Sequence, residues 1–254
     1  MTYPSFDLSG KTALITGAGR GIGKACALAL AHAGANIALG LRDILSGSEV
    51  VHDIRAMGRE VIPLQMDVGN LEQIDQAVAD ATDHFGKLDI LVNNVGVAPG
   101  NLPENVTEAD FDTMIDLNVK GLFFTSQAVG KVMIKQKSGR IINISSQAGF
   151  ISLPEETIYC MTKAAVNHLT KCLAVEWAPH NINVNAVAPT FIETPGTDPY
   201  LADPKNKKEV IGNIPLGRIG RVHEVSGAVV FLASPAASLI TGEVMLIDGG
   251  WTSK

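Results

Sequence analysis

The chain has 254 residues, of which 46% are hydrophobic and 18% charged, and its formal net charge is −6. This length and apolar content suit one α/β domain with a sheet buried on both faces, and the acidic balance without a Lys/Arg block excludes an electrostatic footprint for nucleic acid. The start lacks the apolar region of a signal peptide, and no uncharged apolar stretch is long enough to span a membrane. The six histidines lack the spacing of metal ligands. The three cysteines lack paired spacing, which indicates a reducing cytoplasm.

Short apolar runs alternate with longer helix-forming stretches along the chain. The runs predict strands near residues 11–16, 36–41, 61–66, 88–93, 139–145, 181–187 and 243–247. The stretches between them predict helices near residues 21–33, 44–58, 70–85, 108–136, 157–178, 204–211 and 222–233. Such alternation predicts right-handed βαβ crossovers. We therefore expect a single Rossmann-like domain over residues 1–254, a doubly wound parallel sheet of about seven strands with helices on both faces.

The first strand runs directly into a glycine-rich turn, G-A-G-R-G-I-G at residues 17–23, which precedes a helical stretch. Main-chain N–H groups at a helix N-terminus can bind a phosphate, and glycines let the backbone come close to it. The spacing of Gly17, Gly21 and Gly23 is G-x-x-x-G-x-G, which fits neither G-x-G-x-x-G nor the P-loop pattern. A glycine turn that binds nothing is the alternative.

Polar residues also follow the next three predicted strands. Arg42 follows the second strand, Asp67 the third and Asn94 the fourth. Because ligands of such sheets bind beyond the carboxyl ends of the strands, we expect these side chains to border one cleft. A turn-capping role before Asn70 is the alternative for Asp67.

The helical stretch after the fifth strand contains T-I-Y-C-M-T-K, in which Tyr159 and Lys163 are four residues apart. This spacing is about one helical turn, so both side chains project from one face. An ammonium group beside a phenol favours the phenolate, which predicts a Tyr159 pKa below the usual value of about 10. Such a phenol can exchange a proton with a carbonyl or an alcohol. The pair alone is a weak signal, because the same spacing occurs by chance on many helices.

The stretch after the sixth strand, roughly residues 194–208, is rich in Pro, Asp and Lys. We interpret it as part of a mobile loop over the site, about residues 190–213, rather than as a domain boundary.

Taken together, the motifs resemble those of the short-chain dehydrogenase/reductase family over nearly the whole chain. T-G-A-G-R-G-I-G from residue 16 resembles the family's cofactor loop, N-N-V-G from residue 93 its N-N-A-G motif, and L-N-V-K-G its helix asparagine, here Asn118. I-N-I-S-S ending at Ser146, and then Tyr159 and Lys163, resemble the catalytic serine, tyrosine and lysine. I-T-G-E-V-M-L-I-D-G-G near the C-terminus is similar to the family's last strand.

Two positions depart from the family pattern. Thr190 stands where glycine usually follows the proline Pro189, and Val95 stands where alanine is usual. The branched Thr190 is expected to narrow the substrate mouth, and Val95 to tighten the packing beneath the cofactor. Neither change removes a reactive group.

The resemblance implies that Tyr159 exchanges the proton, that Lys163 lowers its pKa and hydrogen-bonds the nicotinamide ribose, and that Ser146 stabilises charge on the substrate oxygen. Ser146 is preferred to Ser145 because the family serine lies 13 residues before the tyrosine, and neighbouring strand residues face opposite sides. Asn118 is expected to hold a water between Lys163 and solvent, or, alternatively, to satisfy local backbone groups. The expected substrate contacts are Ser146, Gln147, Tyr159 and Thr190.

The resemblance also implies a nicotinamide cofactor and no metal. Its expected contacts are Gly17, Gly19, Arg20, Gly21, Ile22, Gly23, Arg42, Asp67, Val68, Asn94, Gly96, Tyr159, Lys163, Pro189, Ile192 and Thr194. NAD enzymes of this kind place an acid at the end of the second strand to bind the ribose 2′-hydroxyl, and this chain has Leu41 at that position. The next residue is Arg42, and a cation there can hold the 2′-phosphate of NADP. We therefore predict that NADP(H) is preferred to NAD(H). The alternative is that the loop is shifted so that Asp43 binds the 2′-hydroxyl, which would favour NAD(H).

The predicted function is hydride transfer between the cofactor and a secondary alcohol or ketone. A polar expected pocket favours a small sugar, sugar acid or polyol; its residues are Gln147, Ser152, Glu155, Glu156, Thr190 and Glu193. The alternatives are a β-ketoacyl carrier-protein reductase, although an acidic protein suits an acidic carrier poorly, and a non-catalytic nucleotide-binding regulator, against which the intact catalytic set argues. The resemblance implies a homotetramer, and no membrane or nucleic-acid partner is expected.

Overall fold

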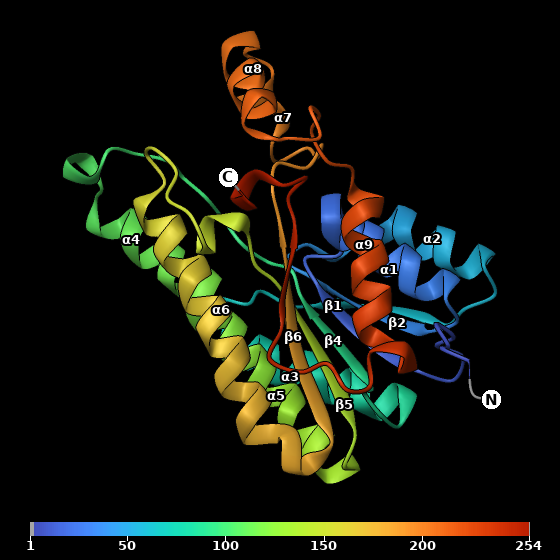
Figure 1. The fold of residues 1–254 in the computed structure, drawn as a ribbon. Helices are drawn as coiled ribbons and strands as arrows, with labels where there is room; N and C mark the ends of the chain where they lie inside the picture. Colours follow the sequence, from blue (N-terminus) through green and yellow to red (C-terminus); the bar gives the residue numbers. More distant parts are fainter. Residues whose placement is uncertain (1–2, 254) are drawn as a thin grey trace.

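The computed structural model describes residues 3–253 and consists of one parallel sheet between two layers of helices (Figure 1). The strands are β1 (Thr12–Thr16), β2 (Asn36–Leu41), β3 (Val61–Gln65), β4 (Ile90–Asn93), β5 (Gly139–Ile144), β6 (Ile182–Pro189) and β7 (Val244–Ile247). Their order is β3-β2-β1-β4-β5-β6-β7, and each neighbouring pair is parallel. The strand order reverses between β1 and β4, where doubly wound sheets bind their ligands. The predicted fold class is confirmed.

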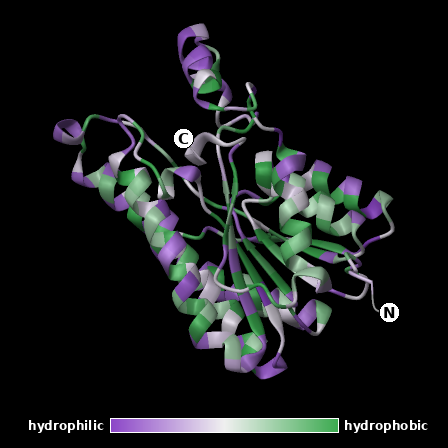
Figure 2. Ribbon diagram, in the orientation of Figure 1, coloured by the Kyte–Doolittle hydropathy of each residue, from purple (hydrophilic) through white to green (hydrophobic). Residues whose placement is uncertain are grey.

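Alternate residues of the central strands enter two different cores. In β1, Ala13 and Ile15 belong to the core beneath α1, α2 and α9, whereas Leu14 belongs to the core beneath α3, α5 and α6. Successive side chains of a strand point to opposite faces, so an apolar run covered on both sides is fully buried, as β1 is. Figure 2 shows the largely hydrophobic colouring of the central strands. The helices are α1 (Gly21–His32), α2 (Ser48–Ala56), α3 (Leu71–Phe85), α4 (Glu108–Ile115), α5 (Leu122–Gln136), α6 (Thr157–Trp177), α7 (Asp198–Leu201), α8 (Pro204–Asn213) and α9 (Val222–Ala233).

Two predicted helices are less regular than expected. The stretch predicted as a helix over 108–136 comprises α4, a π-helical turn at Asp116–Gly121 and α5. The stretch predicted over 44–58 begins with a 3₁₀ turn at Ile44–Gly47, which precedes α2. Turns of the π type occur frequently at functional sites, and this one contains Asn118.

The segment predicted as a mobile loop contains two helices, α7 and α8, which together we call the lid. They lie beyond the end of the sheet where β6 ends (Figure 1). A small apolar cluster around Leu201, Val210 and Ile214 supports them. The ring of Phe191 stacks on Tyr200 of α7 at 5.7 Å and on Trp251 at 6.0 Å. The helix predicted near 204–211 is confirmed as α8, whereas α7 was not predicted, and the mobility of the lid stays a prediction.

Candidate active site

The glycine loop connects β1 to the N-terminus of α1. Gly17 and Gly21 have φ angles of +65° and +55°, a region in which residues with a side chain are strained. A Cβ atom on Gly19 would lie 2.9 Å from the Ser46 Oγ, so the loop lies against the turn that follows β2. The first turn of α1 carries no acidic residue, which leaves its positive end available to a phosphate. These features fit a dinucleotide, and the loop residues Arg20, Ile22 and Gly23 lie where they were predicted.

Asn94 holds the end of β4 against this loop. Its main-chain N–H donates to Thr16 Oγ1 at 2.9 Å, and its Nδ2 donates to the carbonyl oxygens of Thr16 and Gly17 at 3.0 and 3.2 Å. Two residues later, a Cβ atom on Gly96 would lie 3.3 Å from Lys163 Nζ. The β4 end thus joins the expected cofactor loop to Lys163, and the predicted cofactor contact of Asn94 stays a prediction.

The end of β2 carries the residues on which the cofactor preference depends. Leu41 is only 1% exposed and belongs to the apolar core, whereas Arg42 is exposed and its carbonyl oxygen accepts from Gln65 Nε2 at 2.7 Å. The Oδ1 of Asp43 accepts from the Leu45 N–H at 3.0 Å and so caps the 3₁₀ turn. A guanidinium group is therefore free to move at this strand end, while the nearby carboxylate has a structural partner.

Asp67 and Val68 follow β3 at the same edge of the sheet. Asp67 Oδ1 accepts from the Gly69 N–H at 2.9 Å, and the Asp67 N–H donates to Gln73 Oε1 at 2.8 Å. This is the turn-capping role given above as the alternative. The buried Val68 packs against Gly121 at the end of the π-helical turn. The predicted adenine contacts of both residues are not tested by this geometry.

Ser146, Tyr159 and Lys163 come together where β5 ends. The hydroxyl of Ser146 is hydrogen-bonded to that of Tyr159 and also accepts from the Ala148 N–H at 3.1 Å. Ser145 faces away, because its Oγ donates to Asn167 Oδ1 at 2.5 Å. On α6, Lys163 Nζ lies 5.5 Å from the centre of the Tyr159 ring. The serine chosen by spacing is thus the one beside the tyrosine.

Asn118 uses its side chain to join two parts of the site. Its Oδ1 accepts from the Val97 N–H at 2.8 Å, and its Nδ2 donates to the Val97 carbonyl oxygen at 2.8 Å and to Thr162 Oγ1 at 3.1 Å. The side chain therefore satisfies local groups, as the alternative predicted, and it fixes the loop after β4 against α6. A water held by Asn118 stays a prediction.

Burial dominates the ionisation of the tyrosine and the lysine. Burial raises the pKa of Tyr159 to about 12; the Ser146 hydrogen bond opposes this, and the Glu156 and Cys160 charges add to it. Burial also lowers the pKa of Lys163, to about 8, although its Nζ donates to the Ile144 carbonyl oxygen at 2.9 Å. The expectation that Lys163 holds the Tyr159 pKa below its usual value is wrong for this structure, because desolvation disfavours both charged forms.

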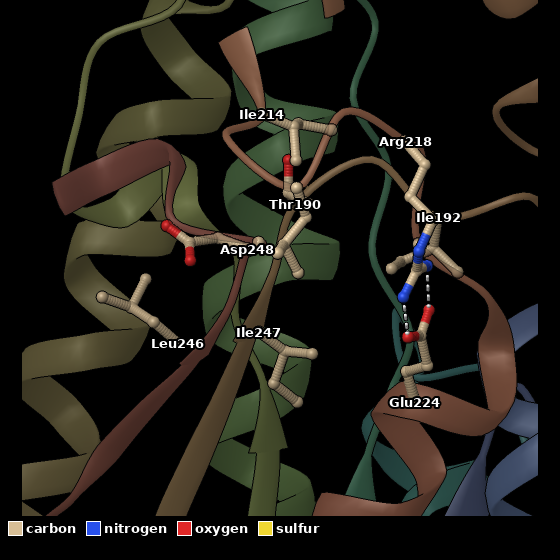
Figure 3. Close-up of a pocket in the computed structure, with 11 residues that line it drawn as sticks. Thr190, Ile192, Ile214, Arg218, Glu224, Leu246, Ile247 and Asp248 are labelled. Carbon is tan, nitrogen blue, oxygen red and sulfur yellow. Dashed lines mark hydrogen bonds and ion pairs between the residues drawn. The ribbon is translucent and has the colours of Figure 1, made fainter. Parts of the chain in front are cut away.

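The residues after β6 border a pocket of about 200 Å³ (Figure 3). Thr190 and Ile192 line it, and Figure 3 shows Arg218 facing Glu224 on its far side, with N–O distances of 2.6 and 2.9 Å. Neither Ser146 nor Tyr159 belongs to its lining. Pro189 ends β6, and Thr194 is hydrogen-bonded to Thr197.

Sequence reasoning missed a buried polar network under the site. Asn93 Nδ2 donates to Ser126 Oγ and to Asn143 Oδ1, both at 2.9 Å, and Asn143 Nδ2 donates to Thr170 Oγ1 at 2.9 Å. The network links β4 and β5 to α5 and α6. A signal was present, because Asn93 and Asn143 are polar residues within otherwise apolar strand runs.

Among residues 3–253, no helix is both long and apolar enough to cross a membrane, and no group of three metal-binding side chains was found.

Comparison with known proteins places the chain among oxidoreductases. The family model described as enoyl-(acyl carrier protein) reductase matches residues 17–252. A 3-oxoacyl-[acyl-carrier-protein] reductase of Synechocystis sp. is 43% identical over 96% of this chain and 97% of its own. A 2-dehydro-3-deoxy-D-gluconate 5-dehydrogenase of Dickeya dadantii is 39% identical, and an NAD-dependent glycerol dehydrogenase of Listeria innocua 40% identical, each over the full length of both chains.

Solved structures agree closely with this fold. A short-chain type dehydrogenase/reductase from Mycobacterium marinum superimposes with a TM-score of 0.94 at 42% identity, over 98% of both chains. A gluconate 5-dehydrogenase from Burkholderia cenocepacia, in complex with NADP and tartrate, superimposes with a TM-score of 0.95 at 35% identity, over 99% of this chain and 98% of that one.

Proposed function

The chain belongs to the short-chain dehydrogenase/reductase family, and from that premise we propose that it oxidises or reduces a small sugar, sugar acid or polyol. The reaction class follows from the family: the protein is a nicotinamide-dependent oxidoreductase that acts on a secondary alcohol or ketone. The observation that supports our assignment of catalytic residues is the contact of Ser146 with Tyr159, one turn from Lys163, at the end of β5.

Each residue of this centre has a distinct chemical task. The bound nicotinamide supplies or accepts the hydride. Tyr159 gives its hydroxyl proton to the substrate carbonyl oxygen in reduction, and it takes the proton from the alcohol in oxidation. Ser146 Oγ donates a hydrogen bond to the same oxygen and stabilises the charge that develops there. Lys163 gives a proton back to Tyr159 after reduction and takes one from it after oxidation, by changing its own charge. Asn118 holds α6 in place. A raised Tyr159 pKa keeps the phenol protonated, as carbonyl reduction requires.

For the cofactor, we propose NADP(H) as the preferred form. Arg42 is exposed at the end of β2 and can pair with a 2′-phosphate, and the adjacent Leu41 offers no acceptor to a 2′-hydroxyl because it is buried. Arg20, exposed in the glycine loop, can assist. The NADP in the Burkholderia cenocepacia structure supports this preference, and the NAD-dependent Listeria innocua relative is the contrary example.

A β-ketoacyl carrier-protein reductase is the second candidate. The 43% identity to the Synechocystis reductase favours it. The net charge of −6 opposes it, because a carrier protein is itself acidic and like charges disfavour docking. The polar residues near Tyr159 also suit a hydroxylated substrate better than an acyl chain.

We further propose a homotetramer in a reducing cytoplasm. The exposed side of α6 has an uncharged stripe bordered by Lys171 and Glu176; the members of the stripe are Met161, Ala164, Ala165, His168, Cys172 and Val175. These positions lie on one side of the helix and suit contact with another subunit. The three cysteines are free, as expected of a chain in a reducing compartment.

A spectrophotometric screen tests the proposed reaction. Polyols, sugars, sugar acids and β-ketoesters would be offered with each cofactor, and the reduced-nicotinamide band would be followed. Tyr159→Phe should lower kcat by at least the roughly 10²-fold typical of lost acid–base catalysis, while cofactor binding is retained. Near-normal turnover by this variant would refute the role of Tyr159, and turnover of β-ketoesters alone would favour the second candidate.

A further inference from the structure

Glu156 lies one turn before Tyr159, at the N-terminus of α6. Its side chain faces the loop after β4, because a Cβ atom on Gly100 would lie 3.4 Å from Glu156 Oε1. Its charge acts on the hydroxyls of both Tyr159 and Tyr200. The Glu156 carboxylate is thus close enough to the catalytic tyrosine and to Tyr200 of the lid to act electrostatically on both.

The second oxygen of Glu156 is buried and has no hydrogen-bond partner within residues 3–253. Leaving a buried polar atom unpaired typically costs about 1–3 kcal/mol. Burial and the neighbouring Glu155 raise the pKa of Glu156 to about 7. A carboxyl group in this condition can accept a hydrogen bond from a hydroxyl and, when protonated, donate one.

Two other side chains share this property, and one of them adjoins the catalytic serine in sequence. Gln147 follows Ser146 and is only 1% exposed, yet neither its amide nitrogen nor its amide oxygen has a partner among the described residues. The Thr190 hydroxyl at the end of β6 is buried and unpaired as well. Donors and acceptors without partners match a substrate with several hydroxyl groups, each of which both donates and accepts.

Carboxylates are the charged groups that act on the Tyr200 hydroxyl, although the lid also carries three lysines. The charged groups that raise the pKa of Tyr200, beyond the effect of burial, are the carboxylates of Glu209, Glu155, Glu156 and Asp203. The lid lysines Lys205, Lys207 and Lys208 are exposed, as are Asp203 and Glu209, so solvent and salt weaken the field of all five. Glu156 is more buried and is screened less. A substrate carboxylate beside Glu156 would meet like charge, which is unfavourable.

We propose that Glu156 is a specificity-determining residue that accepts a hydrogen bond from a hydroxyl group of a neutral polyol or ketose and disfavours sugar acids. This inference rests on the proposed function and selects within its substrate class. Gln147 contributes the second polar contact beside Ser146.

Matched substrate pairs test the inference. Sorbitol with gluconate, and galactitol with galactonate, differ by a CH₂OH group in place of a carboxylate. Assayed at about pH 8.5, above the Glu156 pKa of about 7, the wild type should show a kcat/KM about tenfold higher for the neutral member of a pair. Glu156→Gln keeps the shape and the hydrogen-bonding capacity but removes the charge, so it should raise kcat/KM for the acids roughly five- to tenfold and change that for the polyols by less than about threefold.

Two further variants complete the design. Glu156→Ala should lower kcat/KM for the polyols about tenfold, because the contact itself is lost. Glu243→Gln is the matched control: Glu243 is exposed and precedes β7, at the opposite end of the sheet from the site, so both ratios should stay at the wild-type value.

Each result has a definite meaning. A wild type that prefers the acids, or a Glu156→Gln ratio equal to that of Glu243→Gln, overturns the role of Glu156 and leaves the proposed function standing. If β-ketoesters are turned over and none of the four polyols and sugar acids is, the proposed substrate class is overturned, and this inference with it.

Discussion

Lys163 is the residue on which competing physical requirements meet. Catalysis calls for an ammonium group near Tyr159, but the side chain is only 4% exposed, and this burial disfavours its charge. The hydrogen bond to the Ile144 carbonyl oxygen compensates in part. A lysine whose pKa is about 8 changes its charge near working pH, which suits a group that passes protons to and from a neighbouring tyrosine.

The same burial predicts a pH-dependent cost to stability. The folded pKa of Lys163 is about 8, below its value of 10.5 when exposed. The unfolded chain therefore binds more protons between these limits, so the wild type should gain stability as the pH rises from about 8 to 10.5. Below pH 8 the full penalty is present. Lys163→Met lacks this contribution.

Thermal unfolding without cofactor checks this prediction. The difference in Tm, Lys163→Met minus wild type, should be larger at pH 7 than at pH 9.5, by a few degrees, equivalent to about 2 kcal/mol. Comparing the Tm difference at two pH values cancels the effect of the other titrating groups. It also cancels the cost of the Ile144 carbonyl oxygen that Lys163→Met leaves unpaired. A difference that is constant, or that grows with pH, would show that Lys163 keeps an ordinary pKa.

The second prediction at this scale concerns Arg42. A guanidinium group paired with the 2′-phosphate is worth about 1.5–3 kcal/mol, so Arg42→Ala should weaken NADP(H) binding roughly ten- to a hundredfold and leave NAD(H) nearly unchanged. Dissociation constants from fluorescence titration measure both. Arg55→Ala, at an exposed arginine of α2, is the control.

Two results would contradict the role of Arg42. One is that the wild type binds NAD(H) more tightly than NADP(H). The other is that Arg42→Ala weakens the binding of both cofactors equally. After either result, Asp43 would be the next residue to test. An acid at position 41 is not a useful reverse test, because Leu41 is buried in the apolar core and Leu41→Asp would bury a charge there.

Among the elements, the lid is the one that the main cores support least. Its cluster of Leu201, Val210 and Ile214 is separate from the two cores of the sheet. Trp251 and Phe191 connect it to the rest of the protein by ring stacking. A small apolar cluster gives local opening a low free energy compared with global unfolding.

Trp251→Ala should therefore release the lid without unfolding the sheet. Trypsin cleavage after Lys205, Lys207 or Lys208 in α8 should accelerate about tenfold, the effect of about 1.4 kcal/mol, while Tm changes by only a few degrees. Mass spectrometry identifies the cut sites. Phe150→Ala, at an exposed ring outside the lid, should cleave as the wild type does. An equal rate for both variants, or new cuts throughout the chain, would show that the stack does not hold the lid.

Periodicity predicted the strands and most helices because local sequence determines them. Short apolar runs mark strands that are covered on both faces, as β1 is buried throughout, and the glycine loop has the positive φ angles that its glycines permit. Other features depend on tertiary packing. The π-helical turn at Asn118, the short helix α7 in the lid and the raised Tyr159 pKa depend on contacts between segments distant in sequence. The capping role of Asp67 was foreseen as an alternative, and geometry supports it.

For the whole molecule, the arrangement of layers leaves one long helix with an uncharged outer stripe. Met161 and Val175 of α6 are 43% and 76% exposed, and their spacing of about four turns puts them on one side. A monomer would leave this surface in water, so its position supports the proposed assembly. The network of Asn93, Asn143 and Thr170 lies on the inner side of the same helix layer. Assembly through α6 would therefore brace the element that carries Tyr159 and Lys163 from both sides.

Light scattering tests this assembly with one substitution. The wild type should have a mass about four times the chain mass of 26.8 kDa, and Val175→Lys should lower it, because a buried unpaired ammonium group in a subunit contact is strongly unfavourable. Leu45→Lys is the matched control: Leu45 is also 76% exposed but lies in the turn after β2, so its mass should equal that of the wild type. A wild-type mass of 26.8 kDa would refute the tetramer, and an unchanged mass for Val175→Lys would place the contact elsewhere. If α6 is braced by the contact, Val175→Lys should also lose kcat while its cofactor dissociation constants stay close to the wild-type values.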